Sequence, residues 1–112
     1  MKLKIGKKYY DIYVANKIGT KLRGFMFIKD INYGMLYPNH NVVHTYFFKS
    51  KIDIVGLDQE NKVIYKYENV EKNKIVKISH DKKNTSILEL PKNTSKNIKI
   101  GEILVFECED II

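Results

Sequence analysis

Short stretches in which apolar residues alternate with polar ones follow one another along most of the chain. Between residues 9 and 15, Tyr10, Ile12 and Val14 occupy every second position. A period of two is typical of a β-strand with one buried face. The same pattern predicts extended segments at residues 3–5, 25–28, 34–37, 42–48, 52–57, 62–70, 75–78, 86–90 and 103–109.

The segments between these stretches predict two hairpins and little helix. Residues 6–8 and 58–61 are rich in turn-forming residues and each separates two predicted strands. Residues 16–24 differ, because Asn16 can cap a helix and Gly24 suits the left-handed residue that ends one. One short helix is expected there, and a single helical turn at residues 94–99. The sequence therefore predicts a mainly β fold, an antiparallel sandwich or flattened barrel with one short helix.

Length and composition indicate a single domain over residues 1–112, because 44% of the residues are hydrophobic and can form one core. No apolar run is long enough to span a membrane, and the first residues lack the apolar block of a secretory signal. The lone Cys108 cannot form an intrachain disulfide. A cytoplasmic location is expected from these features.

The formal net charge of +7 suits an acidic partner such as nucleic acid or an anionic membrane. Lysines supply 19 of the 20 basic residues, however, and Arg23 is the only arginine. Nucleic-acid surfaces usually concentrate arginine beside aromatic residues. We therefore interpret the lysines as a solvated surface and expect no nucleic-acid partner.

His44 and Asp53 stand nine residues apart within strand-forming, apolar sequence. Polar residues in such sequence are rarely buried without a partner. If the two flanking strands pair through residues 49–51, the aspartate could orient the histidine, as in a hydrolytic triad. No G-x-S-x-G motif supplies a nucleophile. A structural hydrogen bond between the two residues is therefore favoured over catalysis.

A metal site is a weaker alternative for the histidines. His40 and His44 are four residues apart, but Pro38 and the alternating pattern predict a loop and a strand, not a helix. Adding Asp53 matches no common ligand spacing. We expect no metal and no cofactor, since the chain has neither a glycine-rich phosphate loop nor a Cys-x-x-Cys motif.

Arg23 is unusual in a chain that otherwise uses lysine, because only arginine pairs with a carboxylate through a planar fork. Its partner is either a carboxylate such as Asp53 or Glu89, or an anionic group of a ligand. Tyrosines at alternating strand positions either cover the solvent side of a sheet or form a binding face. They are Tyr9, Tyr13, Tyr65 and Tyr67.

Five blocks occur in a fixed order: residues 23–27 (RGFMF), 34–36 (GML), 44–58, 87–91 (ILELP) and 100–102 (IGE). Over about residues 9–106 they resemble domain-of-unknown-function family 192, an uncharacterised bacterial and archaeal family. The resemblance implies a jelly-roll-like sandwich with a short helix before the arginine, and no established activity, cofactor or catalytic residue. The chain departs from the family pattern at Ser50-Lys51, where Phe-Pro is usual, and at Gly56, where a bulky residue is usual.

These observations favour a non-catalytic module that binds a small molecule or a protein. The alternative is a small hydrolase-like enzyme in which His44 and Asp53 form an acid/base pair and Arg23 holds an anion. We predict that these three residues converge at one end of the sandwich, and that Asp53 is buried and bonded to Arg23, His44 or backbone amides. The candidate ligand-binding residues are Arg23, His44, Tyr46, Asp53 and Glu89.

Overall fold

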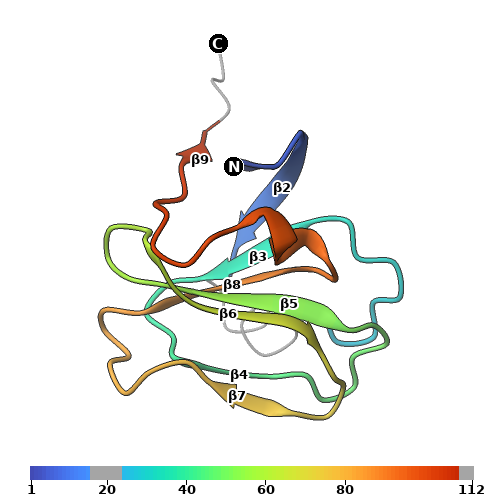
Figure 1. Ribbon diagram of the computed structural model, residues 1–112. Coiled ribbons are helices and arrows are strands. Elements are labelled where there is room, and N and C mark those ends of the chain that lie inside the picture. Colours follow the sequence, from blue (N-terminus) through green and yellow to red (C-terminus); the bar gives the residue numbers. More distant parts are fainter. Residues whose placement is uncertain (16–23, 109–112) are drawn as a thin grey trace.

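The computed structural model describes residues 1–15 and 24–108, and β-strands dominate this part of the chain (Figure 1). A large sheet has the strand order β6-β5-β8-β3-β2-β1-β9, and β4 and β7 form a second, two-stranded sheet. Both sheets are open, so the predicted mainly β fold, a sandwich or flattened barrel, is confirmed. The elements are β1 (Lys2–Ile5), β2 (Lys8–Val14), β3 (Gly34–Tyr37), β4 (Val42–His44), β5 (Ile52–Leu57), β6 (Val63–Val70), β7 (Ile75–Lys77), β8 (Ser86–Pro91), the 3-10 turn η1 (Thr94–Asn97) and β9 (Phe106–Glu107).

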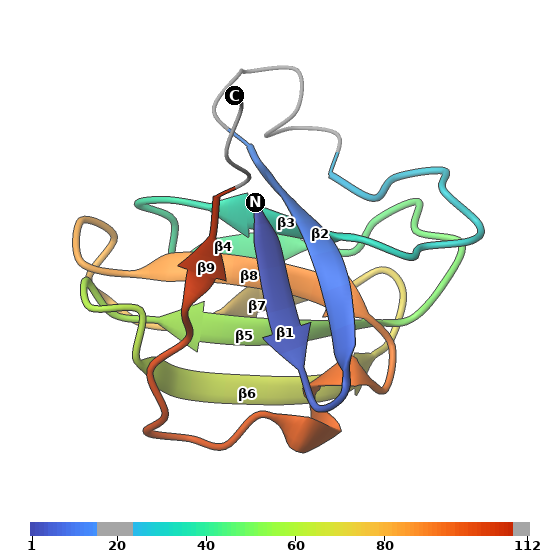
Figure 2. The ribbon, with the colours of Figure 1, turned by 90° about the horizontal axis from the view of Figure 1, so that it is seen from above.

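Two cores lie on opposite faces of the central strands β5 and β8. Because successive side chains of a strand point to opposite faces, Val55 and Leu57 enter one core and Ile52 and Ile54 the other. The first, or upper, core is covered by the β1–β2 hairpin, which crosses over β5 and β8 (Figure 2). The second, or lower, core is covered by the β4–β7 sheet (Figure 1). Both faces of β5 are thus buried along its whole length.

Both predicted hairpins are present. β1 and β2 pair antiparallel around Gly6, whose φ of 63° is left-handed. β5 and β6 pair antiparallel around residues 58–61, where Asp58 Oδ1 accepts hydrogen bonds from the amides of Glu60 and Lys62. Asp58 thus organises this turn through its side chain, as its residue type predicts.

The strands predicted at residues 25–28 and 42–48 are wrong in part. Each segment contains a four-residue turn, closed by hydrogen bonds from the Ile28 amide to the Phe25 carbonyl and from the Phe48 amide to the Thr45 carbonyl. Phe27 and Phe47 occupy the third turn positions with φ of 65° and 63°. That conformation is rare for a bulky residue and costs about 1–3 kcal/mol at each position. Apolar composition alone suggested strands because it does not distinguish a strand from such a turn.

The antiparallel prediction fails at one strand pair. β2 and β3 run parallel, with Ile12 opposite Gly34 and Val14 opposite Leu36. A parallel pair requires a long crossover, and the residues between Val14 and Gly34 are numerous enough to make one. The strand predicted at 103–109 is also shorter: within its described residues, 103–108, Phe106–Glu107 is the strand and Ile103 forms an isolated bridge with Lys62.

The predicted helix at residues 16–24 lies outside the described residues except for its last position. Gly24 has a φ of 49°, the left-handed conformation that the sequence predicts for it. The single helical turn predicted at residues 94–99 is present as η1. Among the described residues, no helix combines the length and apolar character that crossing a membrane requires.

Gly56 allows the two sheets to approach closely. A side chain at this position would meet the Ile78 side chain, since its Cβ would overlap Ile78 Cγ2. Ile78 is buried and belongs to the lower core. The bulk that this chain lacks on β5 is therefore supplied by Ile78, from the segment after β7.

Candidate functional site

Asp53 is fully buried on β5 and faces the segment that contains η1. Its Oδ1 accepts hydrogen bonds from the backbone amides of Asn69 (2.8 Å) and Asn93 (3.1 Å). Its Oδ2 accepts from the Ser95 amide (2.8 Å) and the Ser95 hydroxyl (2.6 Å). The prediction that Asp53 is buried and bonded to backbone amides is confirmed. The carboxylate joins β5, the end of β6 and the start of η1.

These four hydrogen bonds use the four acceptor positions that a carboxylate offers. Among the described residues, His44 is not a hydrogen-bond partner of Asp53. Arg23 itself lies outside the described residues, so its place stays a prediction. The hydrogen bonds of Asp53 to described residues are structural, the kind of role that the sequence favoured over catalysis, but they join it to backbone amides and Ser95 and not to His44.

His44 ends β4, and the strand pairing that would have placed it beside Asp53 is not formed. β4 pairs with β7, whereas β5 pairs with β6 and β8. His44 Nδ1 accepts a hydrogen bond from the Tyr46 amide at 3.2 Å, and its ring lies 5.7 Å from that of Tyr46. Tyr46 is 40% exposed. His44, at the end of β4, and Tyr46, in the turn that follows, therefore lie beside each other, and neither is a hydrogen-bond partner of Asp53.

His40 does not join His44. Its Nδ1 lies 2.8 Å from the Pro38 carbonyl oxygen, and its ring packs against Tyr37. Within residues 1–15 and 24–108, no group of three or more His, Cys, Asp or Glu residues could hold a metal ion.

Glu89 lies on the other face of the large sheet from Asp53. It is 1% exposed, and its neighbours in register, Met35 and Ile54, belong to the lower core. Among the described residues no hydrogen-bond partner reaches its Oε1. Burial raises the pKa of Glu89 to about 8, and the neighbouring Tyr37 hydroxyl opposes this only in part. The carboxyl is thus mostly protonated at neutral pH.

Tyr37 and Gly24 lie next to this carboxyl. A Cβ on Gly24 would lie 2.5 Å from the Tyr37 hydroxyl and 3.3 Å from Glu89 Oε1. Glycine at position 24 therefore leaves the two polar groups room that any side chain would fill. Burial, followed by the charge of Glu89, raises the pKa of the Tyr37 hydroxyl well above its usual value.

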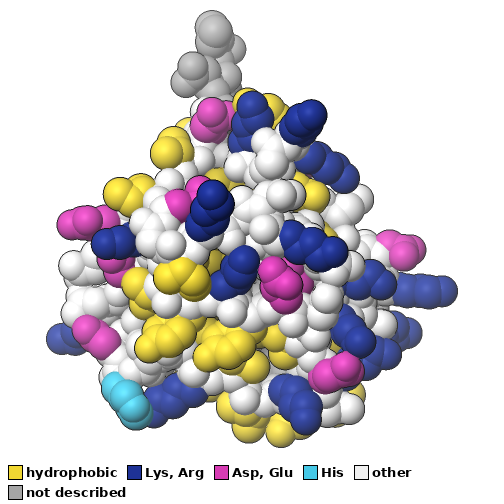
Figure 3. Space-filling view, in the orientation of Figure 1, with side chains coloured by type: hydrophobic (Ala, Val, Ile, Leu, Met, Phe, Trp, Pro, Cys, Tyr) yellow, Lys and Arg dark blue, Asp and Glu magenta, His cyan; other side chains and the backbone are white. Residues whose placement is uncertain are grey.

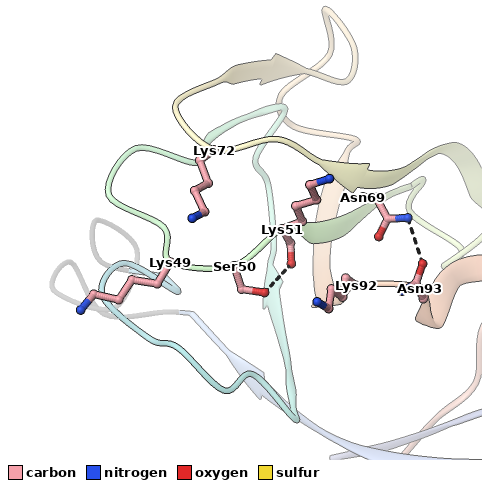
Figure 4. A pocket seen from close by; sticks show the side chains of 7 residues that line it. All are labelled: Lys49, Ser50, Lys51, Asn69, Lys72, Lys92 and Asn93. Carbon is pink, nitrogen blue, oxygen red and sulfur yellow. Dashed lines mark hydrogen bonds between the residues drawn. The ribbon is translucent and has the colours of Figure 1, made fainter.

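A basic pocket of about 410 Å³ opens at the end of the sheet where β5 begins and β6 and β8 end (Figure 4). Lysine side chains also gather on this side of the molecule in the space-filling view (Figure 3). Of the candidate ligand-binding residues that the structure describes, His44, Tyr46, Asp53 and Glu89, none lines this pocket. Its lining residues are Lys49, Ser50, Lys51, Asn69, Lys72, Lys92 and Asn93.

The polar wall of the pocket is held by the Asp53 network. Asn69 and Asn93 donate their backbone amides to Asp53, and the Asn69 Nδ2 donates to Asn93 Oδ1 at 2.9 Å. Both asparagines have left-handed φ values, 52° and 67°, a conformation that asparagine tolerates better than most residues. The buried carboxylate thus fixes two of the residues that line the pocket.

The lysines of the pocket carry an excess of positive charge. Lys51 forms an ion pair with Glu71 (Nζ to Oε1, 3.2 Å). Lys49, Lys72 and Lys92 have no carboxylate partner among the described residues. Sequence reasoning missed this cluster because the four lysines come from three separate segments. The available signal was the Ser50-Lys51 departure from the family pattern, which adds a charge where Phe-Pro is usual.

The family model for DUF192, described as "Uncharacterized ACR", matches residues 1–106. The chain belongs to the DUF192 family. No curated protein matches the chain. The family therefore confirms the resemblance that the sequence blocks carry and supplies no activity for any residue.

Two solved structures show the same fold as this DUF192 chain. A protein of unknown function from Novosphingobium aromaticivorans has a TM-score of 0.77 at 14% identity, covering 94% of this chain and 82% of that one. A protein from Sinorhizobium meliloti, titled "putative transcription regulator", has a TM-score of 0.73 at 16% identity, covering 93% and 89%. At these identities the likeness concerns the fold alone.

Proposed function

We propose that this DUF192 chain is a non-catalytic binding module for a small anionic ligand, held in the pocket lined by Lys49, Lys51, Lys72 and Lys92. The observation that carries the proposal is the pocket itself, a concave site of about 410 Å³ with three lysines that have no carboxylate partner among the described residues. A site of this size accommodates a small molecule.

The charges and donors of the pocket favour a phosphate-bearing ligand. Ammonium groups bind phosphate oxygens as point charges, and the side-chain amide of Asn69 has a second N–H besides the one it donates to Asn93, which adds a neutral donor near them. The single acidic residue paired there, Glu71, neutralises one lysine and leaves the others. An anion therefore lowers the repulsion between the lysines when it binds.

The hydrogen bonds of the candidate acid/base residues support the non-catalytic part of the proposal. All acceptor positions of Asp53 are occupied by structural hydrogen bonds. His44 stands on a different sheet and accepts a bond from its own turn. Among the hydrogen bonds of the described residues, none joins His44 to Asp53, and this supports a binding role over the hydrolase alternative.

A titration with inorganic pyrophosphate tests the proposal. We expect the backbone amide signals of Ser50, Lys72 and Lys92 to shift in NMR spectra, with saturation below about 1 mM. Replacing Lys49, Lys72 and Lys92 together with glutamine should weaken binding by about tenfold or more, because the unpaired charges are removed.

The control is a triple variant of the same charge at the opposite end of the sheet, with Lys62, Lys82 and Lys83 replaced by glutamine. These lysines are exposed and lie in the loops after β5 and after β7. The control should keep its affinity within about twofold. Equal loss in both triple variants would assign the binding to net charge alone and refute a pocket.

Nucleic-acid binding is expected to be weak. Dispersed lysines attract any polyanion, but affinity of this kind falls steeply with salt. In electrophoretic mobility shifts, a mixed-sequence DNA duplex should bind only at low salt and should be released by physiological salt. Sequence-selective, sub-micromolar binding at physiological salt would contradict this expectation.

A further inference from the structure

Two exposed phenylalanines stack on each other at the tips of neighbouring turns. Phe27 is 57% exposed and Phe47 is 64% exposed, and their ring centroids lie 5.7 Å apart with an interplanar angle of 27°. The Phe27 amide donates a hydrogen bond to the Phe47 carbonyl at 3.0 Å, and Met26 forms an isolated antiparallel β-bridge with Phe48. The two turns therefore form one unit that presents both rings to solvent.

Folding alone does not account for these residues. Each phenylalanine has a left-handed φ, at a turn position where glycine or asparagine is the usual residue. The rings contribute little to either core, since most of their surface stays in water. Backbone strain combined with an exposed aromatic side chain is typical of a position kept for contact with another molecule. Both residues also fall within the family blocks at 23–27 and 44–58.

Further exposed apolar side chains lie in the turn after β4 and on the two-stranded sheet of β4 and β7. Phe47 follows Tyr46, whose ring lies 5.7 Å from His44, and His44 pairs with Ile75, which is 65% exposed. Hydrophobic side chains are visible at the lower edge of Figure 3, where Figure 1 draws β7. We call this surface, made of Phe27, Phe47, Tyr46, His44 and Ile75, the aromatic face.

Positive charge borders the aromatic face. An exposed lysine lies two residues after each phenylalanine in the sequence. One more exposed lysine precedes β7 and another is its last residue. Asp30 is the acidic residue next to one of them in the sequence. None of the four lysines forms an ion pair with a described residue. They are Lys29, Lys49, Lys74 and Lys77.

We propose that the aromatic face docks on the surface of an anionic lipid bilayer. Aromatic rings prefer the boundary between headgroups and acyl chains, and lysines beside them reach acidic headgroups while their stems cover apolar surface. A protein partner fits less well, because protein interfaces are depleted in lysine. The aliphatic Ile75 has no role in stacking a nucleic-acid base, which disfavours single-stranded nucleic acid. Lys49 is common to this face and to the lysine pocket, but the aromatic rings and the other three lysines lie outside the pocket lining.

Sedimentation with vesicles tests the docking. The full chain should bind vesicles of phosphatidylcholine with 30% phosphatidylserine and should bind pure phosphatidylcholine at least tenfold more weakly. Replacing both Phe27 and Phe47 with glycine should reduce binding to the anionic vesicles at least tenfold. Glycine adopts both left-handed φ values without strain, so the melting temperature of this variant should equal or exceed that of the wild type.

A matched control removes two exposed aromatic rings from β6, by replacing Tyr65 and Tyr67 with alanine. Its binding should stay within twofold of the wild type. If the glycine variant folds poorly, asparagine at both positions, which also tolerates left-handed φ, replaces it in the same assay. Unchanged vesicle binding by the Phe27 and Phe47 variants, or no binding by the wild type, would overturn the proposal. If the Phe27 and Phe47 variants keep their binding to vesicles but lose binding to a single-stranded oligonucleotide, the proposal is also overturned and the face is assigned to nucleic acid.

Discussion

Replacing Asp53 with alanine is expected to lower the free energy of unfolding by about 3–5 kcal/mol. The substitution leaves the buried Ser95 amide and hydroxyl, and the partly buried amides of Asn69 and Asn93, without the acceptor that they share. Each donor stranded in this way costs about 1–3 kcal/mol, and relaxation of the Asn93–Ser95 segment recovers part of the sum. Urea unfolding followed by circular dichroism measures the change.

Two further variants separate the carboxylate from its packing. Asp53→Asn keeps the shape of the side chain but turns an NH₂ group toward two of the donors. It should therefore lower the free energy of unfolding nearly as much as Asp53→Ala does. Ser95→Ala removes one of the four hydrogen bonds and should cost about 1 kcal/mol. A wild-type urea midpoint for Asp53→Ala would show that the network contributes nothing to stability.

The Glu89→Gln variant is expected to gain stability relative to the wild type as the pH rises. In the folded state burial raises the Glu89 pKa from 4.5 to about 8. Between these values the folded protein keeps a proton that the unfolded chain has released, so the wild type loses stability with rising pH. Glutamine carries no such proton. The difference in unfolding free energy between variant and wild type should therefore grow by about 3–5 kcal/mol from pH 4.5 to pH 8 and then level off.

Urea midpoints at one-unit steps from pH 4 to pH 9 give this difference directly. Glu60→Gln serves as the control, because Glu60 is exposed in the turn between β5 and β6. Its difference from the wild type should not vary with pH. A constant difference for Glu89→Gln would mean that the carboxyl is ionised in the folded protein and has found a partner.

Local patterns in the sequence were sufficient to predict most strands and both hairpins. Alternation gave β2 and the buried run of β5, and the Asp58 turn was identified by its residue types alone. The turns at Phe27 and Phe47 could not be predicted in this way, because left-handed φ values are not expected of phenylalanine. Tertiary contacts between the two turns hold that conformation.

The candidate site was harder to predict, because its residues are brought together only by strand order. Nothing local indicates that residues 49, 72 and 92 meet at one end of the sheet, which follows from β5 lying between β6 and β8. The burial of Asp53 could be predicted from its apolar neighbours. Its partners could not, since Asn69, Asn93 and Ser95 are identified only by the fold.

The Asp53 network also has a consequence for the order of events during protein synthesis. Strand β5 emerges from the ribosome well before Asn93 and Ser95, which supply three of the four donors. Until those residues appear, β5 carries an uncompensated charge within an apolar strand and gains little from being buried. We therefore expect the β5–β6 hairpin to stay unpacked and exposed to solvent while about two dozen more residues are added over a few seconds. A nascent chain stalled before Asn93 should be a preferred substrate for chaperones and proteases, and one stalled beyond η1 should not.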